Sequence, residues 1–138
     1  MSFIPFTYEG WVMKLDWGHG KLTADDKTVH DGDTGYALLD CGRRRYDNTP
    51  FRLWGVNAYE LNDTDPAKRE LAQYGRDFLR GRILGKLVYI RSFKYDEKFG
   101  RILTIIWEKK EDFNQNILSV NAALVAAGLA VPYMGELL

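Results

Sequence analysis

One segment with helical periodicity separates two groups of short strand-like segments, and this order restricts the folds that the chain can adopt. Across residues 65–85 apolar side chains recur at helical spacing opposite charged ones, and Pro66 follows Asp65 where a first helical turn would begin. The apolar positions, which we expect to pack into the core, are Leu71, Tyr74, Phe78, Leu79 and Ile83. The pattern predicts one long helix in the middle of the chain.

Three strands are predicted before this helix. Residues 6–16 combine aromatic and apolar side chains with charged ones, as in a partly exposed strand, and Gly10 marks a candidate bulge. Residues 17–28 carry glycine and aspartate without a period, which indicates a loop that interrupts or extends the first hairpin. Residues 36–40 and 51–56 indicate two further strands, joined by a polar, arginine-rich turn.

The segments after the helix predict a second hairpin and a second helix. Residues 87–93 and 102–107 are apolar, β-branched runs on either side of a turn, and residues 108–115 form a charged connector. Ser119 is a candidate N-cap for a short helix that ends before Gly128, where a left-handed residue is favoured. The predicted order is three strands, a helix, two strands and a helix.

This order favours a small α+β fold that is mainly β. Short strands with a helix inserted between them suit a five-stranded, partly open Greek-key barrel of the oligonucleotide-binding (OB) type with two to three helices, rather than a parallel α/β sheet. The 138 residues are the size of one domain and suffice to bury a core. We therefore expect a single domain over residues 1–138.

Composition excludes several classes of function. Lys plus Arg and Asp plus Glu number 19 each, so the net charge is zero and any contact with nucleic acid must be local. The single cysteine, Cys41, excludes an internal disulfide and a cysteine-rich zinc site. The first residues show no signal peptide, and no apolar run approaches the roughly 18 residues that span a bilayer. These features lead us to expect a cytoplasmic protein.

An acidic turn precedes the second predicted strand. In Asp31-Gly32-Asp33-Thr34 two carboxylates flank a glycine, so that one can bind a hard cation while the other orients the backbone or a bound water. Asp-Gly is also common turn chemistry, which leaves a purely structural role open.

Two arginines and a glutamate add chemistry suited to a phosphate. Strand alternation places Arg52 on the face opposite Phe51 and Leu53, where its guanidinium either binds a phosphate through two donors or faces solvent. Glu60 follows in a loop, and beside a metal-bound phosphate it can polarise a water for attack. Arg101 stands where a hairpin turn enters the next strand. Because a metal and arginines stabilise charge that develops on phosphoryl oxygens, the set matches phosphodiester hydrolysis.

Taken in order, these motifs resemble the thermonuclease family of staphylococcal-nuclease-like domains. The motifs are Asp-Gly-Asp-Thr, Phe-Arg-Leu with a glutamate eight residues after the arginine, Lys-Phe-Gly-Arg, and Val-Asn-Ala-Ala-Leu-Val-Ala-Ala-Gly-Leu-Ala. The resemblance extends over residues 29–133, which leaves residues 1–28 as an N-terminal strand and extended loop. It implies a calcium-dependent endonuclease that cleaves DNA and often RNA and leaves 3′-phosphate ends.

The resemblance implies, by motif position, which residues contact the substrate. Arg52 and Arg101 would grip the scissile phosphate, and Glu60 would act as general base on the attacking water. Phe99 stands where the family often has tyrosine, so that a ring remains for stacking without the hydroxyl. The residues that would contact nucleotides are Lys98, Phe99 and Tyr133.

The same resemblance implies a calcium site with a weakened ligand set. Asp33 would be a calcium ligand, and Asp31 would support it from the surrounding shell. The family's second carboxylate ligand falls at Asn57, and the next ligand, a backbone carbonyl, falls at Ala58. Asparagine keeps an oxygen ligand but removes a negative charge, so we expect weaker calcium binding and consider another divalent cation as the alternative.

Two other functions remain open on the same barrel. A non-catalytic binding module would use the groove for nucleic acid or another ligand, an alternative that Asn57 and the zero net charge favour. A protein-interaction domain would use aromatic residues of the N-terminal segment, Trp11 and Trp17, as a docking surface.

Overall fold

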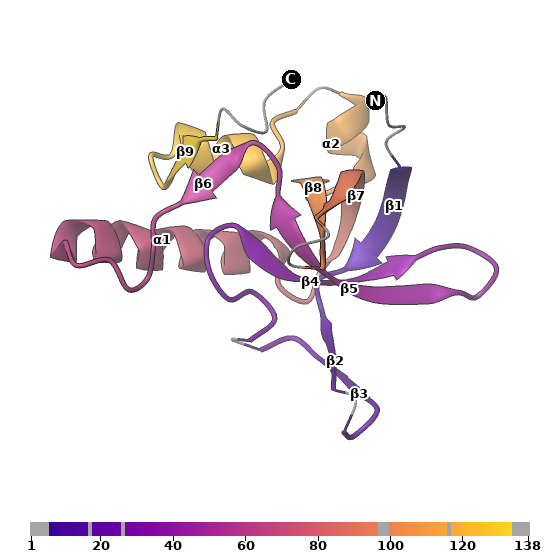
Figure 1. Cartoon of the computed structure of the whole chain (residues 1–138). Coiled ribbons are helices and arrows are strands. Elements are labelled where there is room, and N and C mark those ends of the chain that lie inside the picture. Colours follow the sequence, from indigo (N-terminus) through magenta and orange to yellow (C-terminus); the bar gives the residue numbers. More distant parts are fainter. Residues whose placement is uncertain (1–5, 17, 26, 97–99, 116, 134–138) are drawn as a thin grey trace.

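A closed five-stranded β-barrel forms the body of the protein. The computed structural model describes residues 6–16, 18–25, 27–96, 100–115 and 117–133 (Figure 1). The barrel strands, in the order in which they pair, are β1 (Phe6–Trp11), β4 (Thr34–Asp40), β5 (Tyr46–Leu53), β8 (Arg101–Trp107) and β7 (Leu87–Asp96). The predicted five-stranded OB-type barrel, mainly β with helices added, is confirmed, but it is closed rather than partly open.

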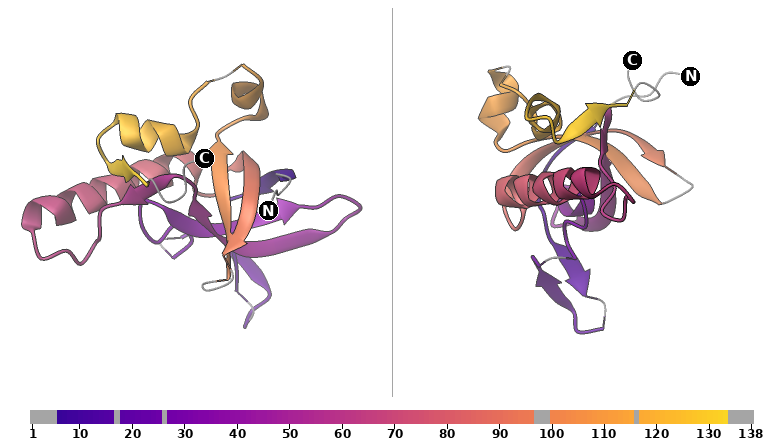
Figure 2. Two further views of the ribbon diagram at one scale, coloured as in Figure 1. Left: turned by 45° about the horizontal axis from the view of Figure 1, so that its top comes forward. Right: turned by 90° about the vertical axis from the view of Figure 1, so that its left-hand side faces the viewer.

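Three helices and two small sheets surround the barrel in the described part of the chain. The helices are α1 (Pro66–Ile83), α2 (Lys110–Asn114) and α3 (Val120–Ala126). The small sheets pair β2 (Lys14–Asp16) with β3 (Lys21–Thr23) and β6 (Val56–Ala58) with β9 (Ala130–Pro132). The β2–β3 hairpin projects from the barrel away from α3 and β9 (Figures 1 and 2). No helix within these described ranges is long and apolar enough to cross a membrane.

Alternate side chains of the strands fill the barrel interior. Phe51, Leu53, Ile90 and Ile106 are fully buried, and each such side chain contributes about 1.5–3 kcal/mol by leaving water. Gly35 makes room for the largest of them, because a Cβ at that position would lie 2.7 Å from the Phe51 ring. The core therefore fixes one face of β5 inward and leaves the other face outward.

Helix α1 begins and packs for reasons visible in its sequence. The Asp65 carboxylate accepts a hydrogen bond from the Ala67 N–H at 3.0 Å, and Pro66 occupies the first turn. Gly75 is buried, and a Cβ there would lie 3.2 Å from the Leu129 carbonyl oxygen. The expectation that Tyr74 packs into the core is wrong: it is 54% exposed, and its hydroxyl donates to Glu70 at 2.8 Å.

The N-terminal third differs most from the prediction. The strand expected over residues 6–16 divides into β1 and β2, and the loop expected over residues 17–28 contains β3. Gly10 does not mark a bulge, since it pairs in register with Leu39 and Val88. It allows β1 and β4 to approach closely instead, because a Cβ there would lie 2.8 Å from the Leu38 carbonyl oxygen on β4. The charged connector expected over residues 108–115 contains α2.

Asn121 links α3 by hydrogen bonds to β8 and to Trp54, the residue that follows β5. Its side chain is buried, accepts from the Ile106 N–H at 3.1 Å, and donates to the Trp54 and Thr104 carbonyls at 2.9 Å each. An Asn121→Ala variant would leave buried backbone groups unsatisfied, so we expect a loss of about 2 kcal/mol in the free energy of unfolding by urea. The exposed Asn114 supplies the control, since Asn114→Ala should change stability little.

Candidate active site

Strand pairing brings the acidic turn and both arginines to one outer face of the barrel. Thr34, at the start of β4, pairs with Arg52 on β5, and Arg52 pairs with Leu103 on β8. Arg101 lies two residues before Leu103 on the same strand, and side chains two residues apart point to the same face. Because Phe51 and Leu53 point into the core, Arg52 and Arg101 both lie outside it.

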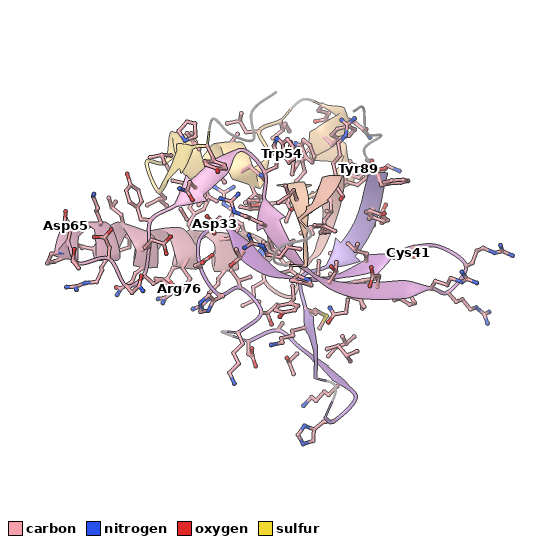
Figure 3. The ribbon with its side chains drawn as sticks, in the orientation of Figure 1. Asp33, Cys41, Trp54, Asp65, Arg76 and Tyr89 are labelled. Atoms are coloured by element: carbon pink, nitrogen blue, oxygen red, sulfur yellow. The ribbon has the colours of Figure 1, made fainter. Side chains whose placement is uncertain are left out.

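The acidic turn, residues 31–34, packs between β6 and α1; Figure 3 labels Asp33 there. Gly32 is buried there, and a Cβ on it would lie 3.0 Å from the Ala58 side chain and 3.4 Å from the backbone of Gly75. Only glycine therefore fits between the two carboxylates without a shift. The motif Asp-Gly-Asp reflects this close packing as well as its charge.

Hydrogen bonds give the two carboxylates different surroundings. Asp31 accepts from the Thr34 hydroxyl at 2.7 Å and from the Asp33 N–H at 3.1 Å. The Asp33 side chain is nearly buried, and its Oδ2 accepts from the Ala58 N–H at 2.9 Å. Asp33 thus connects the start of β4 to β6, the strand that carries Asn57 and Ala58.

Arg52 lies between the residues predicted to hold a metal. Its Nη1 donates to the Leu53 carbonyl at 3.1 Å, and its Nη2 donates to Asn57 Oδ1 at 3.3 Å and lies 3.9 Å from Asp33 Oδ2. The ring of Tyr133 lies over the guanidinium, with 5.3 Å between its centroid and the Arg52 Cζ. A cation held by Asp33 and Asn57 would lie close to the Arg52 guanidinium and would be repelled by its charge.

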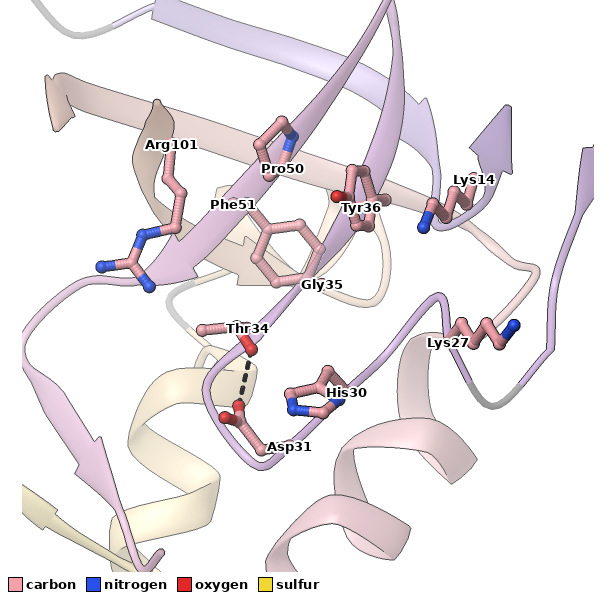
Figure 4. Close-up of a pocket in the computed structure, with 10 residues that line it drawn as sticks. All are labelled: Lys14, Lys27, His30, Asp31, Thr34, Gly35, Tyr36, Pro50, Phe51 and Arg101. Carbon is pink, nitrogen blue, oxygen red and sulfur yellow. Dashed lines mark hydrogen bonds between the residues drawn. The ribbon is translucent and has the colours of Figure 1, made fainter. Parts of the chain in front are cut away.

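The structure describes two of the remaining predicted residues, Glu60 and Arg101. Glu60 is exposed in the loop that follows β6, two residues beyond Ala58. Arg101 is half-buried and lines a pocket of about 580 Å³ together with Asp31 and Thr34 (Figure 4). Lys98 and Phe99 lie outside the described residues.

Sequence reasoning missed the contact that brings Tyr133 to Arg52. The β6–β9 pairing aligns Val56 with Pro132, and the Tyr133 N–H donates to the Gly55 carbonyl at 2.9 Å. The available signal was the short run of residues 130–132 directly after the helix-ending Gly128, which is too brief to be recognised as a strand.

Burial and mutual repulsion separate the acidities of the two carboxyl groups. Burial, together with the charge of Asp31, raises the pKa of Asp33 to about 7, although Ala58 and Arg52 oppose this shift. Burial also acts to raise the pKa of Asp31, but hydrogen bonds with Asp33 and Thr34 outweigh it and leave that pKa below its usual value. A nearby cation would relieve the repulsion.

The raised pKa of Asp33 predicts a pH dependence of stability in the presence of a chelator. Between about pH 4 and pH 7 the folded state binds more protons at Asp33 than the unfolded state, so the free energy of unfolding should fall as pH rises through that range. In Asp33→Asn the side chain stays neutral at every pH, so the decrease in the free energy of unfolding over this range should be smaller than in wild type by about 1–3 kcal/mol. Urea unfolding across this range measures the effect, and Asp77→Asn on the exposed face of α1 is the control.

The donor atoms fit a hard divalent cation only in part. Asp33 offers a carboxylate oxygen, Asn57 an amide oxygen and Ala58 a backbone carbonyl, and Asp31 adds a second carboxylate beside them; all are oxygens of the kind that calcium prefers. No group of three or more Asp, Glu, His or Cys side chains gathers in metal-binding geometry within the described ranges. A site here would carry less negative charge than one with a carboxylate at residue 57.

Asn57→Asp should therefore strengthen divalent-metal binding by about tenfold. A carboxylate at residue 57 would attract a divalent ion more strongly than it attracts the singly charged Arg52. Calcium affinity also depends on the number of charged ligands. Titration calorimetry with calcium measures the change. Asn62→Asp, in the exposed loop beyond Glu60, adds the same charge without adding a ligand at residue 57, and an equal gain in that variant would contradict the prediction.

The barrel and this face define a nuclease-like domain of the OB type. A family model described as staphylococcal nuclease homologue matches residues 50–136, which is more than half of the chain. The chain belongs to this family, so the predicted family is confirmed. The match includes Arg52, Asn57, Glu60 and Arg101, whereas the acidic turn lies before it. A comparison with curated proteins gives no match.

Proposed function

We propose that the chain is a metal-dependent endonuclease that hydrolyses phosphodiester bonds of DNA and RNA and leaves 3′-phosphate ends. The observation that carries this proposal is the placement of Arg52: a guanidinium held by Leu53 and Asn57, 3.9 Å from a buried carboxylate and on the same face as Arg101. Membership of the nuclease homologue family supports the same reaction class. Arginine forks match the oxygen geometry of a phosphate.

The acidic turn and β6 supply the ligands of the proposed cation. Asp33, Asn57 and the Ala58 carbonyl would hold it, with Asp31 fixing the turn through Thr34. A cation held there would supply Lewis-acid chemistry, because it would polarise the phosphoryl oxygens and offset their charge. We propose calcium, or another divalent ion that accepts the neutral Asn57 ligand.

Glu60 and the two arginines perform the remaining tasks. Glu60 is exposed, so water can reach it, and it takes a proton from the water that attacks phosphorus. The new bond joins the water oxygen to phosphorus, the bond from phosphorus to O5′ breaks, and O5′ takes up a proton from solvent. Arg52 and Arg101 stabilise the negative charge that grows on the phosphoryl oxygens during this step.

A non-catalytic nucleic-acid-binding module is the second candidate. The hydrogen bond from Arg52 to Asn57 favours it, because the cationic guanidinium already contacts a position where the family has an acidic ligand. Such a module would keep its affinity for nucleic acid in a chelator and would not depend on Glu60.

Cleavage assays with defined ions test the proposal. Purified protein is incubated with labelled single-stranded DNA, duplex DNA and RNA in calcium, magnesium, manganese or a chelator. We expect cleavage only with a divalent ion, and, from substrates labelled at the 5′ end, labelled products whose mobility changes on phosphatase treatment, as 3′-phosphates require. Folded protein that binds these substrates but cleaves none of them with any ion would overturn the nuclease proposal and establish the binding module.

A further inference from the structure

A second cationic group lies next to the candidate active site. The pocket of about 580 Å³ that contains Asp31 and Arg101 also contains Lys14 and Lys27, which come from the β2–β3 hairpin and the turn after it. In Figure 4, Arg101 and Asp31 lie toward one end of the pocket and the two lysines toward the other. Both lysines precede residues 50–136, the segment that the family model matches.

The backbone on both sides of Lys14 is fixed to the barrel. The side chain of Asn48 on β5 donates to the Met13 carbonyl at 3.0 Å and accepts from the Leu15 N–H at 2.7 Å. The Lys14 ammonium then lies 4.7 Å from the centre of the Tyr36 ring, in a cation–π contact. Lys14 is therefore held over the pocket rather than extended into solvent.

A short turn places Lys27 at the rim of the same pocket. The Lys27 N–H donates to the Asp25 side chain at 2.9 Å, and the Thr28 N–H donates to the Asp25 carbonyl at 3.0 Å. Thr28 is fully buried, and its carbonyl accepts from the Tyr36 N–H at 2.9 Å. The turn is thus attached to β4 directly beside the Tyr36 ring that supports Lys14.

The charges of the pocket suit an anion. Lys14, Lys27 and Arg101 are cationic, and the one carboxylate among the lining residues belongs to Asp31. That carboxylate already accepts hydrogen bonds from Thr34 and Asp33. Ammonium groups bind phosphate as point charges, without the geometric demands of a guanidinium.

We propose that Lys14 and Lys27 form a phosphate-binding subsite for a second phosphodiester of the nucleic-acid strand, adjacent to the one bound by Arg52 and Arg101. This inference rests on the proposed function, since the strand must enter the candidate active site to reach the pocket. The subsite lengthens the recognised substrate beyond the scissile phosphate. It predicts a preference for oligonucleotides over dinucleotides.

Binding measured in a chelator tests the subsite independently of catalysis. The Lys14→Gln/Lys27→Gln variant keeps part of each side-chain stem but removes both charges, and Lys21→Gln/Lys68→Gln removes two exposed lysines that do not line the pocket. Fluorescence anisotropy is recorded with a labelled single-stranded decanucleotide and with a labelled dinucleotide. Thermal unfolding confirms that both variants remain folded.

We expect the pocket variant to bind the decanucleotide about tenfold more weakly and the dinucleotide as wild type does. The slope of log affinity against log salt should become shallower by about 0.7 for the decanucleotide, as the loss of one phosphate contact requires. The control variant should retain the wild-type affinity and slope. Equal losses in both variants, or equal losses for both ligands, would overturn the inference.

The same proteins distinguish failure of the subsite from failure of the nuclease. If wild type cleaves nucleic acid and the pocket variant binds both lengths like wild type, the proposed function stands and the subsite is excluded. If wild type cleaves nothing, but the pocket variant binds the decanucleotide more weakly and the dinucleotide as wild type does, the subsite is supported and the protein is a binding module rather than a nuclease.

Discussion

Glu60→Gln is expected to lower kcat for nucleic-acid cleavage by about 10²–10⁴-fold, because glutamine cannot accept the proton of the attacking water. KM should change little, since the role proposed for Glu60 is to remove a proton and not to hold the substrate. The side chain is exposed, so its neutral isostere should leave the free energy of unfolding within about 0.5 kcal/mol of wild type. Single-turnover cleavage with the activating ion measures the chemical step.

A second exposed glutamate provides the matched control for this experiment. Glu111 in α2 packs beside β7 and β8 rather than at the acidic turn, so Glu111→Gln should cleave at the wild-type rate. A Glu60→Gln protein that retains more than a tenth of wild-type kcat would show that another group, or bulk hydroxide, takes the proton. The general-base role would then be wrong even if the protein is a nuclease.

The parts of the fold that were predicted from sequence are those whose signals are local. Asp65 and Pro66 define the start of α1 through a cap and a preset backbone angle, and alternation around Phe51 and Leu53 identifies the inner face of β5. The β2–β3 and β6–β9 pairs were missed because each strand has three residues and derives its stability from a partner distant in sequence. Periodicity cannot be measured over so short a run.

The candidate site also has features that local sequence motifs predict and features that depend on tertiary packing. The order of the motifs made Asp33, Arg52 and Arg101 candidate site residues, and strand register places the two arginines on one face. What the sequence could not supply was the interplay between these residues: the guanidinium of Arg52 contacts Asn57 directly, and Asp33 reaches β6 through the Ala58 N–H. Both contacts depend on the packing of β6 over the acidic turn, which no local pattern encodes.

The contact between Arg52 and Asn57 also gives Arg52 two tasks that compete. Without a cation, the positive charge of Arg52 partly offsets the repulsion between the Asp31 and Asp33 carboxylates, because it acts to lower the pKa of Asp33. With a cation and a phosphate present, the same guanidinium would turn toward the substrate. Metal binding and release of Arg52 from Asn57 should therefore be coupled.

Replacing Arg52 should have the second of the two largest effects. Arg52→Ala is expected to lower kcat/KM by about 10²–10³-fold, because the proposed reaction loses a guanidinium that stabilises the developing phosphoryl charge. Arg52→Lys should recover only a small part of this loss. An ammonium is a compact charge and lacks the planar fork of donors that lets a guanidinium donate to the Leu53 carbonyl with one nitrogen and face a phosphate with the other.

The stability of the Arg52 variants separates this role from a structural one. Removing the guanidinium leaves the Asp31 and Asp33 carboxyl groups with less compensation, so Arg52→Ala should be less stable than wild type in a chelator and should recover stability when the divalent ion is added. Arg82, in the last turn of α1, pairs with Glu108 at 3.2 Å and supplies the control: Arg82→Ala should keep wild-type kcat/KM and show no such recovery beyond wild type. A folded, metal-stabilised Arg52→Ala protein with wild-type cleavage would show that the arginine balances the acidic turn and takes no part in the reaction.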